Sequence, residues 1–116
     1  MHEYSLAGSI LTFCEKESGK HPDKKIREVT LLIGVMGGVE TDLLEEALNH
    51  LKMPGPFADT RFSLEKDPVL LKCRNCRKEN SLYKIALQCP SCSSEDVEFI
   101  GGRELLIKSI TYGTGK

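Results

Sequence analysis

Two Cys-x-x-Cys pairs constrain this chain more than any other feature. Cys73 and Cys76 form the first pair, Cys89 and Cys92 form the second, and twelve residues separate the pairs. Each pair can place two thiolates on one tight turn, and two such turns brought together make the tetrahedral four-sulfur cage that Zn²⁺ accepts. A closed cage leaves no open position for a substrate, so the spacing predicts a structural zinc site that performs no chemistry.

Paired cysteines have three other common uses: disulfides, a redox site and an iron site. Two disulfides would require an oxidising compartment, and the first residues lack the basic-then-apolar layout of a secretory signal. A thioredoxin-like redox site needs one such pair at the start of a helix, whereas here two pairs flank a short polar segment. A mononuclear iron site also accepts four thiolates, and the spacing leaves that alternative open.

The segment around the cysteines is too poor in apolar residues to fold without help. The chain has 116 residues, 40% of them hydrophobic, which is enough for one domain core. Between the outer cysteines, however, the core-forming side chains are only Leu82, Tyr83, Ile85, Ala86 and Leu87. We therefore expect a metal-stapled insert, residues 67–102, within a domain formed by residues 1–66 and 103–116.

The net charge and the length of the apolar runs exclude two classes of function. A net charge of −1 gives no general attraction to a polyanion, so we expect no binding to nucleic acid. No apolar run approaches the roughly eighteen residues that a membrane-spanning helix needs, so we expect no membrane contact. These features predict a cytoplasmic protein.

Apolar periodicity predicts two amphipathic helices. The first follows Ser5 as N-cap and ends at Gly19, and the second follows Thr41 and Asp42. A stretch with three glycines, residues 34–39, precedes the second helix and predicts a turn that uses positive φ. The expected buried positions are Leu6, Ile10, Phe13 and Cys14 in the first helix, and Leu43, Leu44, Ala47, Leu48 and Leu51 in the second.

Alternating and continuous apolar runs predict three strands, near residues 25–34, 60–66 and 103–112, with the last as a central strand. The first two strands flank the second helix as a crossover unit, so they should be parallel. The predicted fold class is α+β: a three-stranded sheet with two helices on one face, plus a zinc-ribbon-like insert with the four-cysteine site.

Outside the cysteine pairs, the amino terminus offers the one set of candidate ligands with chelating geometry. A free amine on Met1, the amide and Nδ1 of His2 and the amide of Glu3 can supply nitrogen donors in a plane, which suits Ni²⁺ or Cu²⁺. The simpler interpretation is a frayed terminus with an accidental histidine. His21, His50 and Cys14 have no second ligand at a suitable spacing, so we expect a loop histidine, a helix-end histidine and a buried inert thiol.

Four blocks of sequence together resemble the HypA/HybF family, the nickel metallochaperones of [NiFe]-hydrogenase maturation. The blocks are residues 1–10 (MHEYSLAGSI), residues 33–40 (IGVMGGVE), the paired Cys-x-x-Cys motif and residues 102–110 (GRELLIKSI). The likeness extends through nearly the whole chain, with the blocks in the family's order and spacing.

The resemblance implies a metallochaperone and not an enzyme. Nickel would bind as transferable cargo at the free terminus through Met1, His2 and Glu3, and zinc at Cys73, Cys76, Cys89 and Cys92. Transfer would involve the GTPase HypB and the hydrogenase large subunit, and in some members urease and its accessory proteins. We expect a monomer or a weak homodimer.

Two departures from the family pattern are visible. Glycine often follows the second cysteine of each pair, where a left-handed backbone is easiest, but Arg77 and Ser93 stand there in this chain. The turn Val35-Met36-Gly37-Gly38 also lacks the usual Leu-Ser-like pair. The main rival function is a zinc-ribbon adaptor for nucleic acid or protein, supported by a local basic stripe of Lys72, Arg74, Arg77, Lys78 and Lys84.

Overall fold

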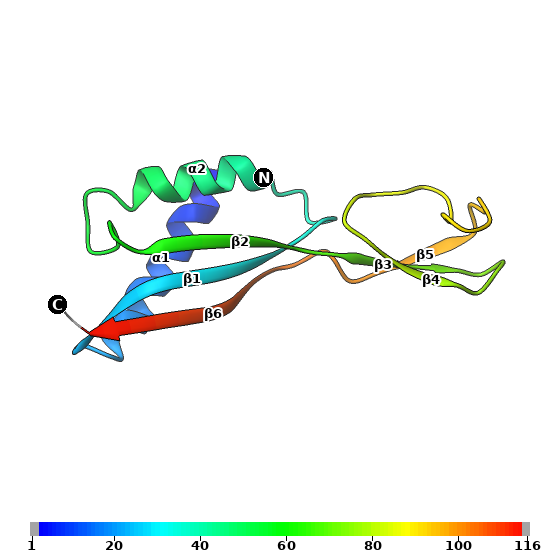
Figure 1. Cartoon of the computed structure of the whole chain (residues 1–116). Helices are drawn as coiled ribbons and strands as arrows, with labels where there is room; N and C mark the ends of the chain where they lie inside the picture. The colour runs from blue at the N-terminus through cyan, green and yellow to red at the C-terminus, as the bar shows by residue number, and fades with distance from the viewer. Residues whose placement is uncertain (1–2, 115–116) are drawn as a thin grey trace. The chain divides into compact units, whose positions relative to one another are not determined.

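The computed structural model describes residues 3–114, which form two helices and two three-stranded sheets (Figure 1). The predicted α+β class with an insert between sheet strands is confirmed. In chain order the elements are α1 (Glu3–Gly19), β1 (Lys24–Gly34), α2 (Thr41–Leu51), β2 (Arg61–Asp67), β3 (Val69–Cys73), β4 (Glu79–Leu82), β5 (Val97–Ile100) and β6 (Leu105–Thr114).

The first sheet has the strand order β2-β1-β6. Figure 1 shows β1 and β2 running in the same direction and β6 in the opposite one, as the crossover through α2 predicts. Residues 103–112 were expected to form a central strand, and this was wrong: β1 is central and β6 lies at the edge. The apolar run suggested a strand buried on both faces, but Leu106 is 46% exposed.

The described chain divides into two compact units. The first contains the residues up to Leu31, Val39–Glu65 and the residues from Ile107 onward; the second contains Leu32–Gly38 and Lys66–Leu106. The second unit therefore includes the end of β1 and the glycine-rich turn as well as the cysteine segment.

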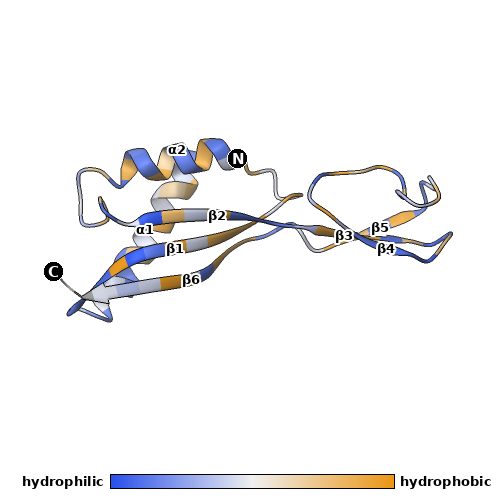
Figure 2. Ribbon diagram, in the orientation of Figure 1, coloured by the Kyte–Doolittle hydropathy of each residue, from blue (hydrophilic) through white to orange (hydrophobic). Residues whose placement is uncertain are grey.

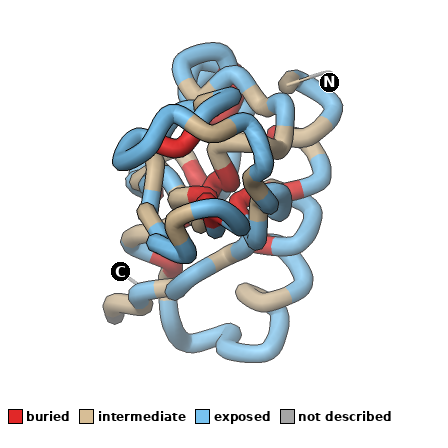
Figure 3. Tube along the Cα trace, turned by 90° about the vertical axis from the view of Figure 1, so that its right-hand side faces the viewer, coloured by how far each residue is buried: buried red, intermediate tan, exposed pale blue. Residues whose placement is uncertain are grey.

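The core of the first unit is formed by one face of each helix and by alternate residues of β1. Val29 and Leu31 are fully buried, as the period-two pattern predicts. Figure 2 shows hydrophilic and hydrophobic residues alternating around α2, and Figure 3 shows buried residues lying inside the exposed ones. The buried helical residues are Ala7, Ile10 and Cys14 in α1 and Leu44, Ala47 and Leu48 in α2.

The helix predictions need three corrections. Helix α1 already includes Glu3, so Ser5 is not its N-cap. Phe13 is 41% exposed, and Ala7 is buried although it was not expected to be. The buried face of α1 is therefore rotated about the helix axis relative to the predicted face. Leu43 and Leu51 of α2 are likewise exposed. The apolar stripes are thus wider than the faces that the core covers, as is common for surface helices.

The second sheet has the order β4-β3-β5, with both neighbours antiparallel to β3. The stretch between the cysteine pairs supplies the strand β4. Strands β3 and β4 form a hairpin, and the first cysteine pair lies in its turn. The core of this sheet is small: Leu71, Cys73 and Cys89 are buried, with partly buried Cys76, Leu82, Ala86, Val97 and Phe99 packed against them.

Gly34 and Gly102 allow two backbone segments of the second unit to approach each other closely. The N–H of Met36 donates to the carbonyl of Gly102 at 2.6 Å, and the N–H of Gly34 donates to that of Glu104 at 2.8 Å. A Cβ added at Gly34 would overlap the carbonyl group of Gly102. Gly38, with φ 74°, supplies the positive φ that the glycine-rich turn was predicted to need.

No helix among residues 3–114 is long and apolar enough to cross a membrane.

Gly34→Ala is expected to lower the free energy of unfolding by at least about 2 kcal/mol, because the methyl group would meet rigid backbone atoms. Thermal or urea unfolding measures this loss. Gly8→Ala in α1 is the matched control, since nothing lies within 4 Å of its added Cβ and alanine favours a helix. That control should be neutral or slightly stabilising, and an equal loss in both variants would contradict the close-approach argument.

Cys14 is fully buried on α1, as predicted, and burial followed by the nearby charge of Glu17 raises the pKa of its thiol to about 11. The thiolate is the reactive form, so alkylation of Cys14 in the folded protein at pH 8 should be slower by at least about 100-fold than in urea. Peptide mass spectrometry after timed iodoacetamide treatment measures both rates.

Because the pKa of the Cys14 thiol is raised in the folded state, the free energy of unfolding should also decline as the pH rises from 9 towards 11.

Candidate metal centre

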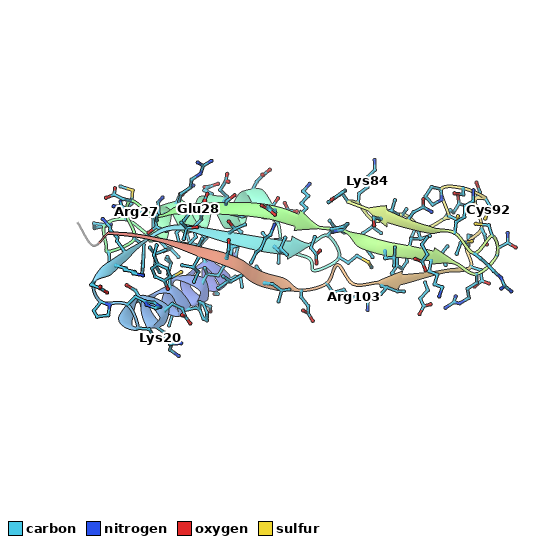
Figure 4. The ribbon with its side chains drawn as sticks, turned by 60° about the horizontal axis from the view of Figure 1, so that its bottom comes forward. Lys20, Arg27, Glu28, Lys84, Cys92 and Arg103 are labelled. Atoms are coloured by element: carbon cyan, nitrogen blue, oxygen red, sulfur yellow. The ribbon has the colours of Figure 1, made fainter. Side chains whose placement is uncertain are left out.

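Four cysteine side chains meet at one end of the second sheet. The Sγ atoms of Cys73, Cys76, Cys89 and Cys92 all lie within 4.8 Å of one another. The closest separations are 3.6 Å, between Cys73 and Cys92 and between Cys76 and Cys89. Figure 4 shows the sulfur atoms gathered near the labelled Cys92. The predicted four-cysteine cluster is therefore present in the fold.

The two cysteine pairs are held by the same backbone arrangement. The N–H of Cys73, the last residue of β3, donates to the carbonyl of Lys78 at 3.0 Å. The N–H of Cys89 donates to the carbonyl of Ser94 at 2.8 Å, which is the same five-residue spacing. Each pair thus lies on its own closed turn, and the turns present their thiols to each other.

Both turns use a left-handed residue directly after the second cysteine. Arg77 has φ 63° and Ser93 has φ 65°. These are the positions at which the sequence predicts a strained backbone, because glycine is absent from both. A non-glycine residue in this region is uncommon, and here the geometry of the turn requires it twice.

Several N–H groups donate hydrogen bonds to the sulfur atoms of the cluster. The N–H groups of Cys76 and Ser91 each donate to a sulfur at 3.4 Å, to Cys73 and Cys89 respectively. The Asn75 amide donates to Cys92 at 3.6 Å, across from one turn to the other. This bond, followed by one from the Ser94 backbone, lowers the pKa of the Cys92 thiol to about 6.

Sequence reasoning missed the role of Asn75. Its only signal was its place inside the first Cys-x-x-Cys pair, and the partner that it contacts lies seventeen residues away.

The cluster fits a tetrahedral metal ion. Four sulfurs at about 2.3 Å from Zn²⁺ would be about 3.8 Å apart, close to the observed 3.6 Å contacts. All four donors are thiols, and all four are free of disulfides. Soft sulfur donors in this geometry suit zinc or iron and leave no position for a substrate.

Of the predicted amino-terminal ligands, Met1 and His2 lie outside the described residues. Glu3 is described: it stands in the first turn of α1, and its Oε2 accepts a hydrogen bond from the N–H of Glu40 at 3.1 Å. Tyr4, the next residue, is hydrogen-bonded through its hydroxyl to Nδ1 of His50 at 3.0 Å. These two contacts join the start of α1 to α2.

The remaining candidates are not members of the cysteine cluster. His21 packs its ring against Tyr112, with ring centroids 4.8 Å apart, and His50 lies in the last turn of α2. Among residues 3–114, the four cysteines are the one group of metal-binding side chains brought together.

The basic stripe of the insert is largely compensated. Lys72 stands opposite Glu79 on one side and Glu98 on the other, and Arg74 forms an ion pair with Asp96 at 2.9 Å. Residues 67–102 contain five basic and five acidic side chains in all.

Comparison with known proteins gives one consistent result. Residues 1–112 match the family model described as "Hydrogenase/urease nickel incorporation, metallochaperone, hypA". The hydrogenase maturation factor HypA of Aquifex aeolicus is 33% identical over 95% of this chain and 96% of its own. That of Shewanella oneidensis is 30% identical over 95% and 93%.

A solved structure agrees with the sequence comparisons. The Ni metallochaperone HypA from Helicobacter pylori, a solution structure, matches with a TM-score of 0.61 and 25% identity, over 95% of this chain and 96% of its own. The structural match covers nearly the whole chain, and the family match begins at the first residue. This chain belongs to the HypA family of hydrogenase and urease nickel-incorporation metallochaperones.

Proposed function

We propose that this chain binds Ni²⁺ and delivers it for the maturation of a [NiFe]-hydrogenase, with urease as a further recipient. The family match over residues 1–112 carries this proposal, because it includes both the amino terminus and the cysteine pairs. As a carrier, the protein releases its metal unchanged and catalyses no reaction.

Nickel binds at the free terminus through Met1, His2 and Glu3. The amine of Met1, the amide and ring of His2 and the amide of Glu3 provide four nitrogen donors. A terminal site of this kind can both capture nickel and release it.

Zinc in the four-cysteine cluster stabilises the insert. Tyr83, Ile85 and Leu87 of the insert are each at least 59% exposed, so they add little to its small core. Binding of the metal to four thiolates supplies the missing folding free energy, as in other small zinc modules.

The recipient and the partners follow from the family. The chain works in the cytoplasm, as a monomer or weak homodimer, with the GTPase HypB and the hydrogenase large subunit. The rival function, a nucleic-acid adaptor, loses support from the equal numbers of acidic and basic residues in the insert, which give no net attraction to phosphates.

Titration of untagged protein with Ni²⁺ is expected to give one bound ion per chain and the absorption spectrum of a planar, diamagnetic centre. His2→Ala, or one residue added before Met1, should abolish that spectrum, whereas His21→Ala should retain it. Mass spectrometry of the intact chain verifies the terminal residue. Affinity should fall as the pH falls, because the amine and amides must lose protons. A planar spectrum that survives in His2→Ala would refute the terminal site.

Cys73→Ser is expected to lose zinc and to increase hydrogen exchange throughout residues 67–102, because one of four ligands is gone. Zinc content by mass spectrometry of the native protein and exchange by peptide measure the two effects. Cys14→Ala removes a buried cysteine outside the cluster, so it should keep one zinc per chain. Unchanged zinc content in Cys73→Ser would contradict the assignment.

A further inference from the structure

The contacts of Glu3 and Tyr4 give the start of α1 a defined place along α2. Glu3 contacts Glu40 and Tyr4 contacts His50, at opposite ends of that helix. Ten residues separate the two contact points, which corresponds to about 15 Å of helix. Two anchors this far apart prevent the first turn of α1 from sliding along α2 or rolling on it.

The Glu3 contact replaces a cap that α2 lacks. Glu40 is the N-cap of α2 and makes no side-chain capping bond. In a capping box, a glutamate three residues after the N-cap accepts the N-cap N–H, but that position is occupied by Leu43. Glu3 performs this role from α1, and its charge also lies where the positive end of the α2 dipole favours an anion.

The Tyr4 contact has two components. The hydroxyl is 3.0 Å from Nδ1 of His50, and the two rings meet edge to face with centroids 5.8 Å apart. Tyr4 is 46% exposed, so burial alone does not account for its orientation.

We propose that Glu3 and Tyr4 are positioning residues, which clamp the start of α1 to both ends of α2 and thereby slow the release of nickel from the proposed terminal site. This inference rests on the proposed nickel function. It assigns the Glu3 carboxylate to the α2 cap, so that Glu3 contributes to nickel only through its peptide nitrogen.

Three variants separate positioning from ligation. Glu3→Ala should speed hydrogen exchange at the Glu40 amide by about 5-fold, the usual value of one cap, and should speed nickel dissociation while leaving the planar spectrum unchanged. Glu3→Gln keeps a side-chain oxygen for the Glu40 N–H, so it should preserve exchange, dissociation and spectrum. Glu15→Ala, at an exposed acid on the same helix, is the control without effect.

A fourth variant separates positioning from simple stabilisation of α2. Leu43 is 48% exposed, so Leu43→Glu can build a capping box inside α2. In the Glu3→Ala background this change should restore slow exchange at Glu40 but not slow nickel dissociation. Tyr4→Ala should speed nickel dissociation and leave exchange at Glu40 unchanged.

Several results would overturn the inference. Exchange at Glu40 that does not respond to Glu3→Ala would refute the clamp. A nickel spectrum altered alike in Glu3→Gln and Glu3→Ala would make the carboxylate a ligand. Restoration of both properties by Leu43→Glu would reduce Glu3 to a stabilising residue. If the wild-type protein binds no nickel at its terminus but Glu40 still responds, the nickel proposal fails and only the clamp on α2 stands.

Discussion

The meeting of four thiols is the constraint on which the second unit depends. Around the cysteines its buried cluster is Leu71 with Cys73 and Cys89, with a few partly buried neighbours, and Ile33 and Val69 are buried elsewhere in the unit. A core this small does not offset the chain entropy of a unit of this length. Its two turns also hold Arg77 and Ser93 in a left-handed conformation, which raises the cost further. The proposed metal would therefore be part of the fold of this unit.

The first unit is organised differently, because its helices and sheet supply an ordinary apolar core. Its distinctive feature is the way in which α2 receives its cap. A carboxylate at the start of α1 accepts the N–H that the sequence of α2 leaves without a partner. The stability of α2 and the position of the start of α1 consequently depend on the same hydrogen bond. Local and tertiary structure are coupled at the end of the chain where nickel is proposed to bind.

Periodicity and ligand spacing predicted much of this structure. The alternating Val29 and Leu31 identified β1, and the cysteine spacing identified the cluster. The errors about burial share one cause: a list of apolar residues does not say how wide a face the rest of the chain will cover. Phe13 and Leu106 were placed in the core for that reason, and both are exposed. The contacts of Glu3 and Asn75 could not be predicted, because each joins residues distant in sequence through a single hydrogen bond.

The buried thiol and the four-cysteine cluster also differ in how they react with oxidants. Cys14 is inaccessible on α1, so oxidation is directed to the cluster. There, Cys73 and Cys92 have their sulfurs 3.6 Å apart, as do Cys76 and Cys89. A disulfide bond of about 2 Å requires only a small approach from that distance. Zinc at the proposed site would occupy the thiolates as ligands, so the metal proposed to stabilise the insert would also protect it from internal crosslinking.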